Sequence, residues 1–194
     1  MKCITKKCEK NVVYFNISSE NAVVPFECEI GDLRQLFSYF HYKAPNVDSL
    51  QSPYLRPEFH EVILSEMLKR NDVFRFCAQN AKIDEELKIV ALNGNSICNR
   101  CKRFLCKRMT SRGAKRDETR KETDLECLLR HIRNSIAHGH VFIIHNGNYI
   151  SILLEDQNDK GNTTARIVCC QADLKKWRTV LESAIKSQNS TVEE

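Results

Sequence analysis

The chain has 194 residues, of which 42% are hydrophobic and 28% are charged. This composition excludes an intrinsically disordered chain, because it supplies enough apolar side chains for one substantial core. The formal net charge of +5 suits an anionic partner without requiring one.

The beginning of the chain lacks the apolar core of a secretory signal, and no apolar run is long enough to cross a bilayer. We therefore expect a cytoplasmic protein that does not enter a membrane. Because the cytoplasm is reducing, most of the ten cysteines are expected to be free thiols.

The N-terminal part combines a weakly patterned extension with a helix and a loop. Residues 1–31 show little periodicity, and 12–15 and 22–30 are consistent with short strands or partly ordered segments. Asp32 is a suitable N-cap for a helix, and the apolar residues of that helix recur at helical spacing: Leu33, Leu36, Phe37 and Phe40. Residues 43–57 hold three prolines and are expected to form a loop.

The middle of the chain has helical periodicity up to a glycine at position 139. Apolar spacing predicts a helix over 58–77, another over 84–91 and a continued helical face over 97–109. A further helix is expected over 118–138, with an apolar stripe formed by Leu125, Leu128, Leu129, Ile132 and Ile136. Gly139 is well placed to end this helix, because glycine tolerates the left-handed backbone that often follows a helix.

The last part of the chain changes to strands. Strand-forming runs occupy 141–144, 149–154 and 163–170, and the Asn146–Gly147 pair between the first two is a strong hairpin signal. Asp173 can then cap a last helix, whose core-facing residues are expected to be Leu174, Trp177, Leu181 and Ile185.

These elements predict a single domain over 1–194 that is mainly α. We expect an N-terminal extension (1–31), a helical bundle (32–138), a small three-stranded antiparallel β-meander (141–170) and a closing C-terminal helix (173–187).

The end of the 118–138 helix carries polar side chains that suit phosphodiester chemistry. Arg130, Asn134 and His138 recur at i, i+4 and i+8 opposite the apolar stripe, and Arg133 lies at the edge of the core. A guanidinium can hold two phosphate oxygens, a histidine can take or give a proton, and an asparagine can orient either neighbour. RNA supplies its own nucleophile, the 2′-hydroxyl, so such a site needs no metal. On spacing alone, a solvated basic helix face accounts for the same residues.

The segment from Leu128 to Gly139 closely resembles the signature of the HEPN superfamily. That signature is an arginine, usually followed by a polar residue, and a histidine a few positions later on the last helix of a bundle. Arg133 matches the arginine, Asn134 the polar residue and His138 the histidine. The following strands and closing helix resemble those of HEPN proteins from plasmids and bacterial defence loci. The broader resemblance extends from about Asp124 to Ile185. Residues 1–110 resemble the family only as a helical bundle, and the first thirty residues show no resemblance.

The resemblance implies a metal-independent endoribonuclease without a cofactor, acting as a homodimer with a composite site at the interface. It implies that Arg133 steadies the scissile phosphate, that His138 transfers a proton and that Asn134 supports them. Arg133 and His138 are about 140° apart on an ideal helix. Either the helix end loosens, or a second protomer completes the pair across a twofold axis.

A basic segment leads into the motif helix. Residues 100–121 contain ten arginines and lysines against two acidic residues. We interpret the segment as a patch that follows phosphates, although a solvated helix and loop is the alternative. Arg116 and Arg120 are therefore candidate substrate-binding residues, together with Arg130 and His140 near the motif.

Three cysteines have the spacing of half a zinc site: Cys98, Cys101 and Cys106. Cys3 and Cys8 could supply further ligands. Core packing is the stronger interpretation, because a buried free cysteine behaves as a small apolar residue, so we expect no metal.

Other residues near the motif have simpler interpretations. His131 and His145 are expected at the surface. Trp177 is expected to anchor the last helix in the core rather than to stack on a base.

The leading hypothesis is an endoribonuclease that cleaves RNA through attack of the 2′-hydroxyl, as a toxin or anti-phage defence effector. An antitoxin protein is a further expected partner. The alternative is a non-catalytic HEPN module that binds RNA or a partner protein. A weaker third hypothesis is a zinc-stabilised regulatory protein.

Overall fold

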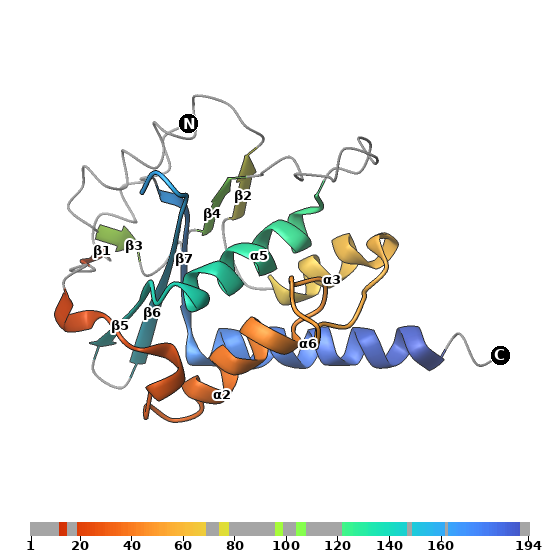
Figure 1. The fold of residues 1–194 in the computed structure, drawn as a ribbon, viewed down its shortest axis with the longest axis horizontal. Helices are drawn as coiled ribbons and strands as arrows, with labels where there is room; N and C mark the ends of the chain where they lie inside the picture. The colour runs from red at the N-terminus through yellow and green to blue at the C-terminus, as the bar shows by residue number, and fades with distance from the viewer. Residues whose placement is uncertain are drawn as a thin grey trace.

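A computed structural model of the chain describes residues 12–14, 19–68, 74–77, 96–98, 104–107, 122–146, 149–161 and 163–190. The strands lie to one side of the molecule, and helices α3 and α6 lie to the other (Figure 1). Helix α5 lies between them, since it packs against β6 on one side and α3 on the other.

The larger sheet has the strand order β2-β4-β7-β6-β5. Its strands are β2 (Phe74–Cys77), β4 (Phe104–Lys107), β5 (Val141–Asn146), β6 (Tyr149–Gln157) and β7 (Thr163–Cys170). β2 and β4 are parallel and the other neighbours are antiparallel. A separate small sheet pairs β1 (Val12–Tyr14) with β3 (Ser96–Cys98). The predicted meander is thus part of a wider sheet, and the pairing of Asn146 with Tyr149 confirms the predicted hairpin.

Three strands lie where the sequence predicts helix. The predicted 58–77 helix is correct as far as Met67 and wrong for β2, and the predicted helical face over 97–109 is wrong for β3 and β4. A short apolar run fits the periodicity of a helix and that of a strand, so hydrogen bonding with a neighbouring strand decides which of the two forms. β4 pairs with β7 through Leu105 and Arg166, which satisfies backbone groups of both strands. The predicted 84–91 helix lies outside the described residues.

The fold therefore combines helices, including a C-terminal helix, with a mostly antiparallel sheet, and the mainly α prediction is confirmed only in part. The described helical portion is smaller than the predicted bundle over 32–138, because β2, β3 and β4 fall within that range.

The described N-terminal helices bury the residues expected of them. α2 (Leu33–Ser38) runs directly into the π-helical segment η3 (Tyr39–Lys43). The predicted apolar residues are buried, namely Leu33, Leu36, Phe37 and Phe40. Asp32 precedes α2 as predicted, but its carboxylate pairs with Lys175 of α6 and makes no capping hydrogen bond.

Short helical turns complete this part of the chain. η1 (Ser19–Asn21) and η2 (Pro25–Glu27) precede α2, and Ala22 between them bridges to Phe142 of β5. Residues 44–56 form the predicted loop, after which η4 (Pro57–Phe59) leads into α3 (His60–Met67).

Helix α5 (Asp124–Ala137) is the core helix that carries the motif. A capping box begins it: Glu126 N–H donates to Thr123 Oγ1 at 3.2 Å, and Thr123 N–H donates to Glu126 Oε2 at 2.9 Å. The whole predicted stripe is at most 1% exposed: Leu125, Leu128, Leu129, Ile132 and Ile136. The predicted first residues of this helix, 118–121, lie outside the described residues.

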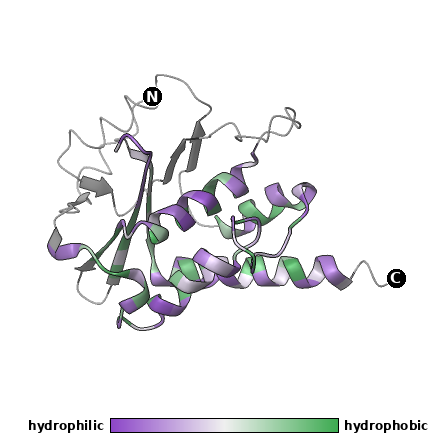
Figure 2. Ribbon diagram, viewed as in Figure 1, coloured by the Kyte–Doolittle hydropathy of each residue, from purple (hydrophilic) through white to green (hydrophobic). Residues whose placement is uncertain are grey.

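Helix α6 (Gln171–Ser190) closes the fold and alternates hydrophobic with hydrophilic stretches along its length (Figure 2). Leu174, Trp177 and Leu181 are buried, and Trp177 Nε1 donates to the Met67 carbonyl at 3.1 Å, which confirms Trp177 as a core anchor. Asp173 lies in the first turn, where its carboxylate accepts from Cys170 N–H at 2.8 Å. No helix within the described residues has the length and apolar character needed to span a membrane.

Candidate functional site

A glycine-containing turn fixes the end of α5. Gly139 has a φ of +69°, and its N–H donates to the Ile136 carbonyl at 3.2 Å. His140 N–H donates to the Ser135 carbonyl at 2.9 Å. Together these bonds form a Schellman motif, and Gly139 ends the helix in the left-handed conformation, as predicted. The turn sets His138 and His140 on either side of the glycine, with ring centroids 6.2 Å apart.

The two histidines of this turn differ in exposure. His138 is exposed and forms no side-chain hydrogen bond with a described residue. His140 is half-buried, and its Nδ1 has no hydrogen-bond partner within the described residues. His138 therefore offers an imidazole to solvent, while His140 lies beside it with an unused ring nitrogen.

Arg133 is half-buried, and its guanidinium rests on the neighbouring backbone and side chains. Nη1 donates to Asn134 Oδ1 at 3.3 Å and Nη2 donates to the Asp48 carbonyl at 3.2 Å. Nε is buried and has no partner among the described residues. No hydrogen bond or ring contact joins Arg133 to His138, so the structure does not bring the predicted pair together within one chain.

Asn134 connects Arg133 to a buried ion pair. Its Nδ2 donates to Asp156 Oδ2 at 3.4 Å, and the same oxygen accepts from His131 Nδ1 at 2.6 Å. Asp156 lies in β6 and is 3% exposed, and His131 is fully buried. Through Asn134, this pair holds one side of Arg133 in place.

The prediction that His131 lies at the surface is therefore wrong. The sheet covers a second face of α5, where β6 packs against it, so residues off the predicted stripe are also buried. Burial lowers the pKa of His131, but hydrogen bonds to Asp156 and Cys127 outweigh it and raise the pKa to about 9. His131 is thus a buried cation paired with Asp156. The side chain of His145 lies outside the described residues.

Arg130 is occupied by a carboxylate. Its Nε donates to Glu122 Oε1 at 2.5 Å and its Nη2 donates to Glu122 Oε2 at 2.9 Å, which is a bidentate pair. Its predicted partners in substrate binding, Arg116 and Arg120, lie outside the described residues.

His41 is a neighbour of the motif that the sequence does not reveal. It lies in η3, which packs against α5. Burial, and next the positive charge of Arg133, lower the pKa of His41. Its ring contacts Tyr42 at 4.2 Å and Phe26 at 5.3 Å between centroids. No local pattern links this histidine to a helix 90 residues later, so only tertiary structure places it beside Arg133.

The described residues hold no cluster of three or more His, Cys, Asp or Glu side chains arranged for a metal ion. Cys28, Cys127 and Cys169 are buried thiols that form no disulfide with a described residue. The side chains of the cysteines considered for zinc lie outside the described residues: Cys3, Cys8, Cys98, Cys101 and Cys106.

The end of α5 carries the sequence Arg-Asn-x3-His-Gly, on which the resemblance to HEPN domains rests, and the comparison with family models agrees. The model of the HEPN pEK499 p136 family matches residues 62–191, about two thirds of the chain. The chain belongs to this family, which confirms the resemblance and extends it from the motif back to α3. No curated protein and no solved structure matches the chain.

Proposed function

We propose that this HEPN protein is a metal-independent endoribonuclease, with Arg133 and His138 as its catalytic residues and Asn134 supporting Arg133. The observation that carries the proposal is the end of α5. There the guanidinium of Arg133 has no carboxylate partner among the described residues, and the imidazole of His138 is exposed. The two residues lie within one and a half turns of helix.

The proposed reaction needs only groups of the chain and of RNA. The 2′-hydroxyl loses its proton and attacks the adjacent phosphorus, and the bond to the 5′-oxygen of the next nucleotide breaks as that oxygen gains a proton. The products are a 2′,3′-cyclic phosphate and a 5′-hydroxyl end. His138 serves in one of the two proton transfers, and Arg133 stabilises the negative charge on the phosphate.

The proposal includes a homodimer with a composite site. Arg133 and His138 are not in contact within one chain, and positions five residues apart are about 140° apart on a helix. A twofold axis beside α5 would set the Arg133 of one protomer against the His138 of its partner. His140, Arg116 and Arg120 are proposed to bind the RNA backbone. Arg130 would first have to exchange Glu122 for a phosphate.

A second candidate is a non-catalytic HEPN module that binds RNA or a partner protein. The observation in its favour is that Arg133 already donates to Asn134 and Asp48 within the chain. A role as a toxin or anti-phage effector in the cytoplasm, with an antitoxin as partner, is part of the first proposal and rests on the family resemblance.

The test compares the purified wild type with His138→Ala on total RNA in the presence of EDTA. Because general acid–base groups contribute about 10²–10⁴-fold, we expect the cleavage rate to fall by about that factor. Thermal unfolding should stay the same, since His138 is exposed. Mass spectrometry of the fragments should find cyclic phosphate ends.

His145→Ala is the matched control, because it removes a histidine that has no proposed role. Equal cleavage by the wild type and His138→Ala would overturn the catalytic assignment. RNA binding without cleavage by either protein would favour the module. A strictly monomeric protein in light scattering would exclude the composite site.

A further inference from the structure

A second histidine lies beside the motif, in the π-helical segment η3. The Ala44 N–H donates to the Tyr39 carbonyl at 2.9 Å, which closes the wide turn of a π-helix. Such segments are rare, and they occur frequently at functional sites. η3 packs against α5, and both the charge and the backbone of Arg133 act on His41. His41 and Arg133 are therefore neighbours within one chain.

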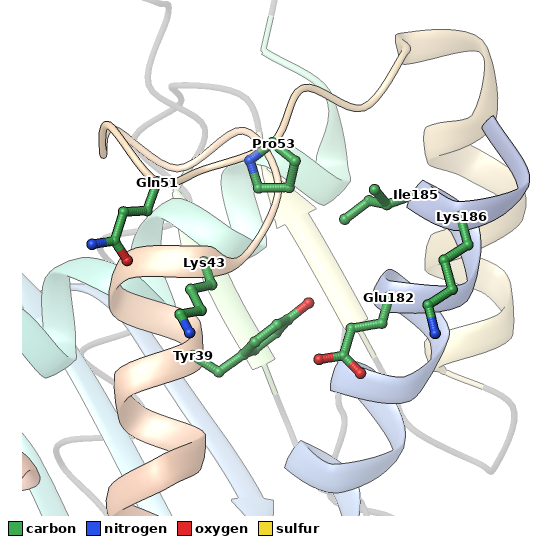
Figure 3. Close-up of a pocket in the computed structure, with 7 residues that line it drawn as sticks. All are labelled: Tyr39, Lys43, Gln51, Pro53, Glu182, Ile185 and Lys186. Atoms are coloured by element: carbon green, nitrogen blue, oxygen red, sulfur yellow. The ribbon is translucent and has the colours of Figure 1, made fainter. Parts of the chain in front are cut away.

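The packing around η3 fixes the position of His41. The Tyr39 ring extends from η3 toward α6, beside the pocket between these two elements (Figure 3). The guanidinium of Arg178 in α6 lies 5.2 Å from the centroid of this ring. Two residues after Tyr39, the His41 ring makes edge-on contacts with Tyr42 and Phe26, at 4.2 and 5.3 Å between centroids. The imidazole is thus held in place before any ligand binds, as a catalytic group must be.

Both neighbours have a polar atom without a partner. His41 Nδ1 and Arg133 Nε are each buried, and neither has a hydrogen-bond partner among the described residues. Both residues as a whole are only half-buried, so solvent reaches part of each side chain. Buried polar groups nearly always have a partner. Two unpaired nitrogens on neighbouring side chains therefore indicate a group from outside the chain that contacts both.

The protonation state of His41 suits a base. Burial, and next the charge of Arg133, lower the pKa of His41 from its ordinary value of 6.5, against a smaller effect of the Arg133 backbone. The imidazole is therefore neutral at neutral pH and can accept a proton. The proposed cleavage needs such a group, because it includes two proton transfers and His138 serves in only one of them.

We propose that His41 is a further catalytic residue, the general base that takes the proton of the 2′-hydroxyl; this inference rests on the proposed function. Nδ1 accepts the proton directly or through one water molecule. The 2′-oxygen then forms its bond to phosphorus, and the bond from phosphorus to the 5′-oxygen breaks. The partner's His138 donates a proton to the leaving 5′-oxygen. One protomer thus supplies Arg133 and His41 to each composite site, and the other supplies His138.

The first test measures cleavage of RNA by the full chain carrying His41→Ala, in the presence of EDTA. The rate should fall by about 10²–10⁴-fold, which is what a general base contributes. His145→Ala is the matched control and should cleave like the wild type. A folded His41→Ala variant that cleaves at the wild-type rate would overturn this inference and leave the roles of Arg133 and His138 intact. A wild type that cuts no RNA would overturn the proposed function, and this inference with it.

The second test separates the two proton transfers with an RNA oligonucleotide in which sulfur replaces the 5′-oxygen of the scissile bond. A thiol is far more acidic than an alcohol, so the sulfur leaves as a thiolate and needs no general acid. On this substrate His138→Ala should regain the wild-type rate, whereas His41→Ala should stay about 10²–10⁴-fold slower. Equal recovery of the two variants, or recovery of His41→Ala alone, would overturn the assignment of His41 as the base.

Added imidazole distinguishes a missing base from a packing defect. Thermal unfolding of His41→Ala is measured first, because the substitution removes ring contacts with Tyr42 and Phe26. In the folded variant, imidazole should restore about tenfold or more of the lost rate, since a general base contributes about 10²–10⁴-fold. If His41→Ala is unfolded, His41→Gln replaces it in the cleavage tests, because it keeps a polar side chain that cannot act as a base. A folded His41→Ala variant that imidazole does not restore would show that the ring serves packing, which contradicts the inference.

Discussion

The cationic side chains of α5 and its C-cap residue His138 fall into two groups, which differ in their partners. We call the part up to Ile132 the first half and the part from Arg133 to His138 the second half. In the first half, Arg130 is bound by both carboxylate oxygens of Glu122, and His131 is paired with the buried Asp156. In the second half, Arg133 and His138 have no carboxylate partner within the described part of the chain. The change occurs within three residues of one helix.

This difference separates side chains that stabilise the fold from those that remain available for a ligand. A buried cation that loses its carboxylate partner destabilises the protein strongly, so the first half is committed to the fold. A guanidinium held only by neutral acceptors can still attract a phosphate. Helical spacing does not make this distinction, since Arg130 lies on the same face as Asn134 and His138.

Removing the carboxylate of Asp156 should have the largest effect on stability. Asp156→Ala removes the carboxylate that accepts from the buried His131 and from Asn134. We expect the free energy of unfolding to fall by about 3–5 kcal/mol, as measured by urea denaturation. Asp159→Ala is the matched control, because Asp159 is exposed in the turn after β6 and should change stability by less than about 0.5 kcal/mol. If both variants had the same stability, the comparison between the two halves would fail.

The sequence predicts well the helix, the turn and the strands that surround this site. The apolar stripe of α5, its end at Gly139, the hairpin between β5 and β6 and the core position of Trp177 are all confirmed. Each depends on a local pattern that tertiary structure does not override: a helical period, a glycine just past a helix or an Asn-Gly pair between two strand-forming runs.

The partners of the site could not be predicted in the same way. Asp156 falls in a polar run after the predicted end of its strand, but β6 continues to Gln157 and buries it. His131 lies outside the apolar stripe, and its burial follows from the position of β6. His41 reaches Arg133 only because η3 packs on α5. These contacts join residues that lie far apart in the sequence, and no local sequence pattern predicts such contacts.

The His131–Asp156 pair should also make stability depend on pH. The pKa of His131 is raised to about 9 in the folded protein from its ordinary value of 6.5, which applies to the unfolded chain. The pair therefore contributes fully below pH 6.5, and the contribution is lost as pH rises through 9. At 1.36 kcal/mol per pKa unit, the loss is at most about 3 kcal/mol.

The measurement is urea denaturation on either side of this window, in the wild type and in Asp156→Ala. The difference between the two proteins isolates the pair from other groups that titrate at high pH, such as cysteine thiols. We expect the two stabilities to converge as pH rises. A constant difference between the proteins from about pH 6.5 to about pH 9 would show that His131 does not titrate in this window.

The smallest effect on stability is expected at Arg130, whose guanidinium we assign to the stability of the fold and not to RNA binding. Glu122→Gln removes the charge of the carboxylate but keeps an acceptor, so we expect a loss of about 1 kcal/mol or less in the free energy of unfolding. RNA affinity should change by no more than in Glu61→Gln, which removes an equal charge from an exposed position on α3. Tighter RNA binding by Glu122→Gln than by this control, measured by filter binding at fixed salt, would mean that a released Arg130 reaches phosphate. Arg130 would then belong with Arg133, and the boundary between the two halves of α5 would lie one turn earlier.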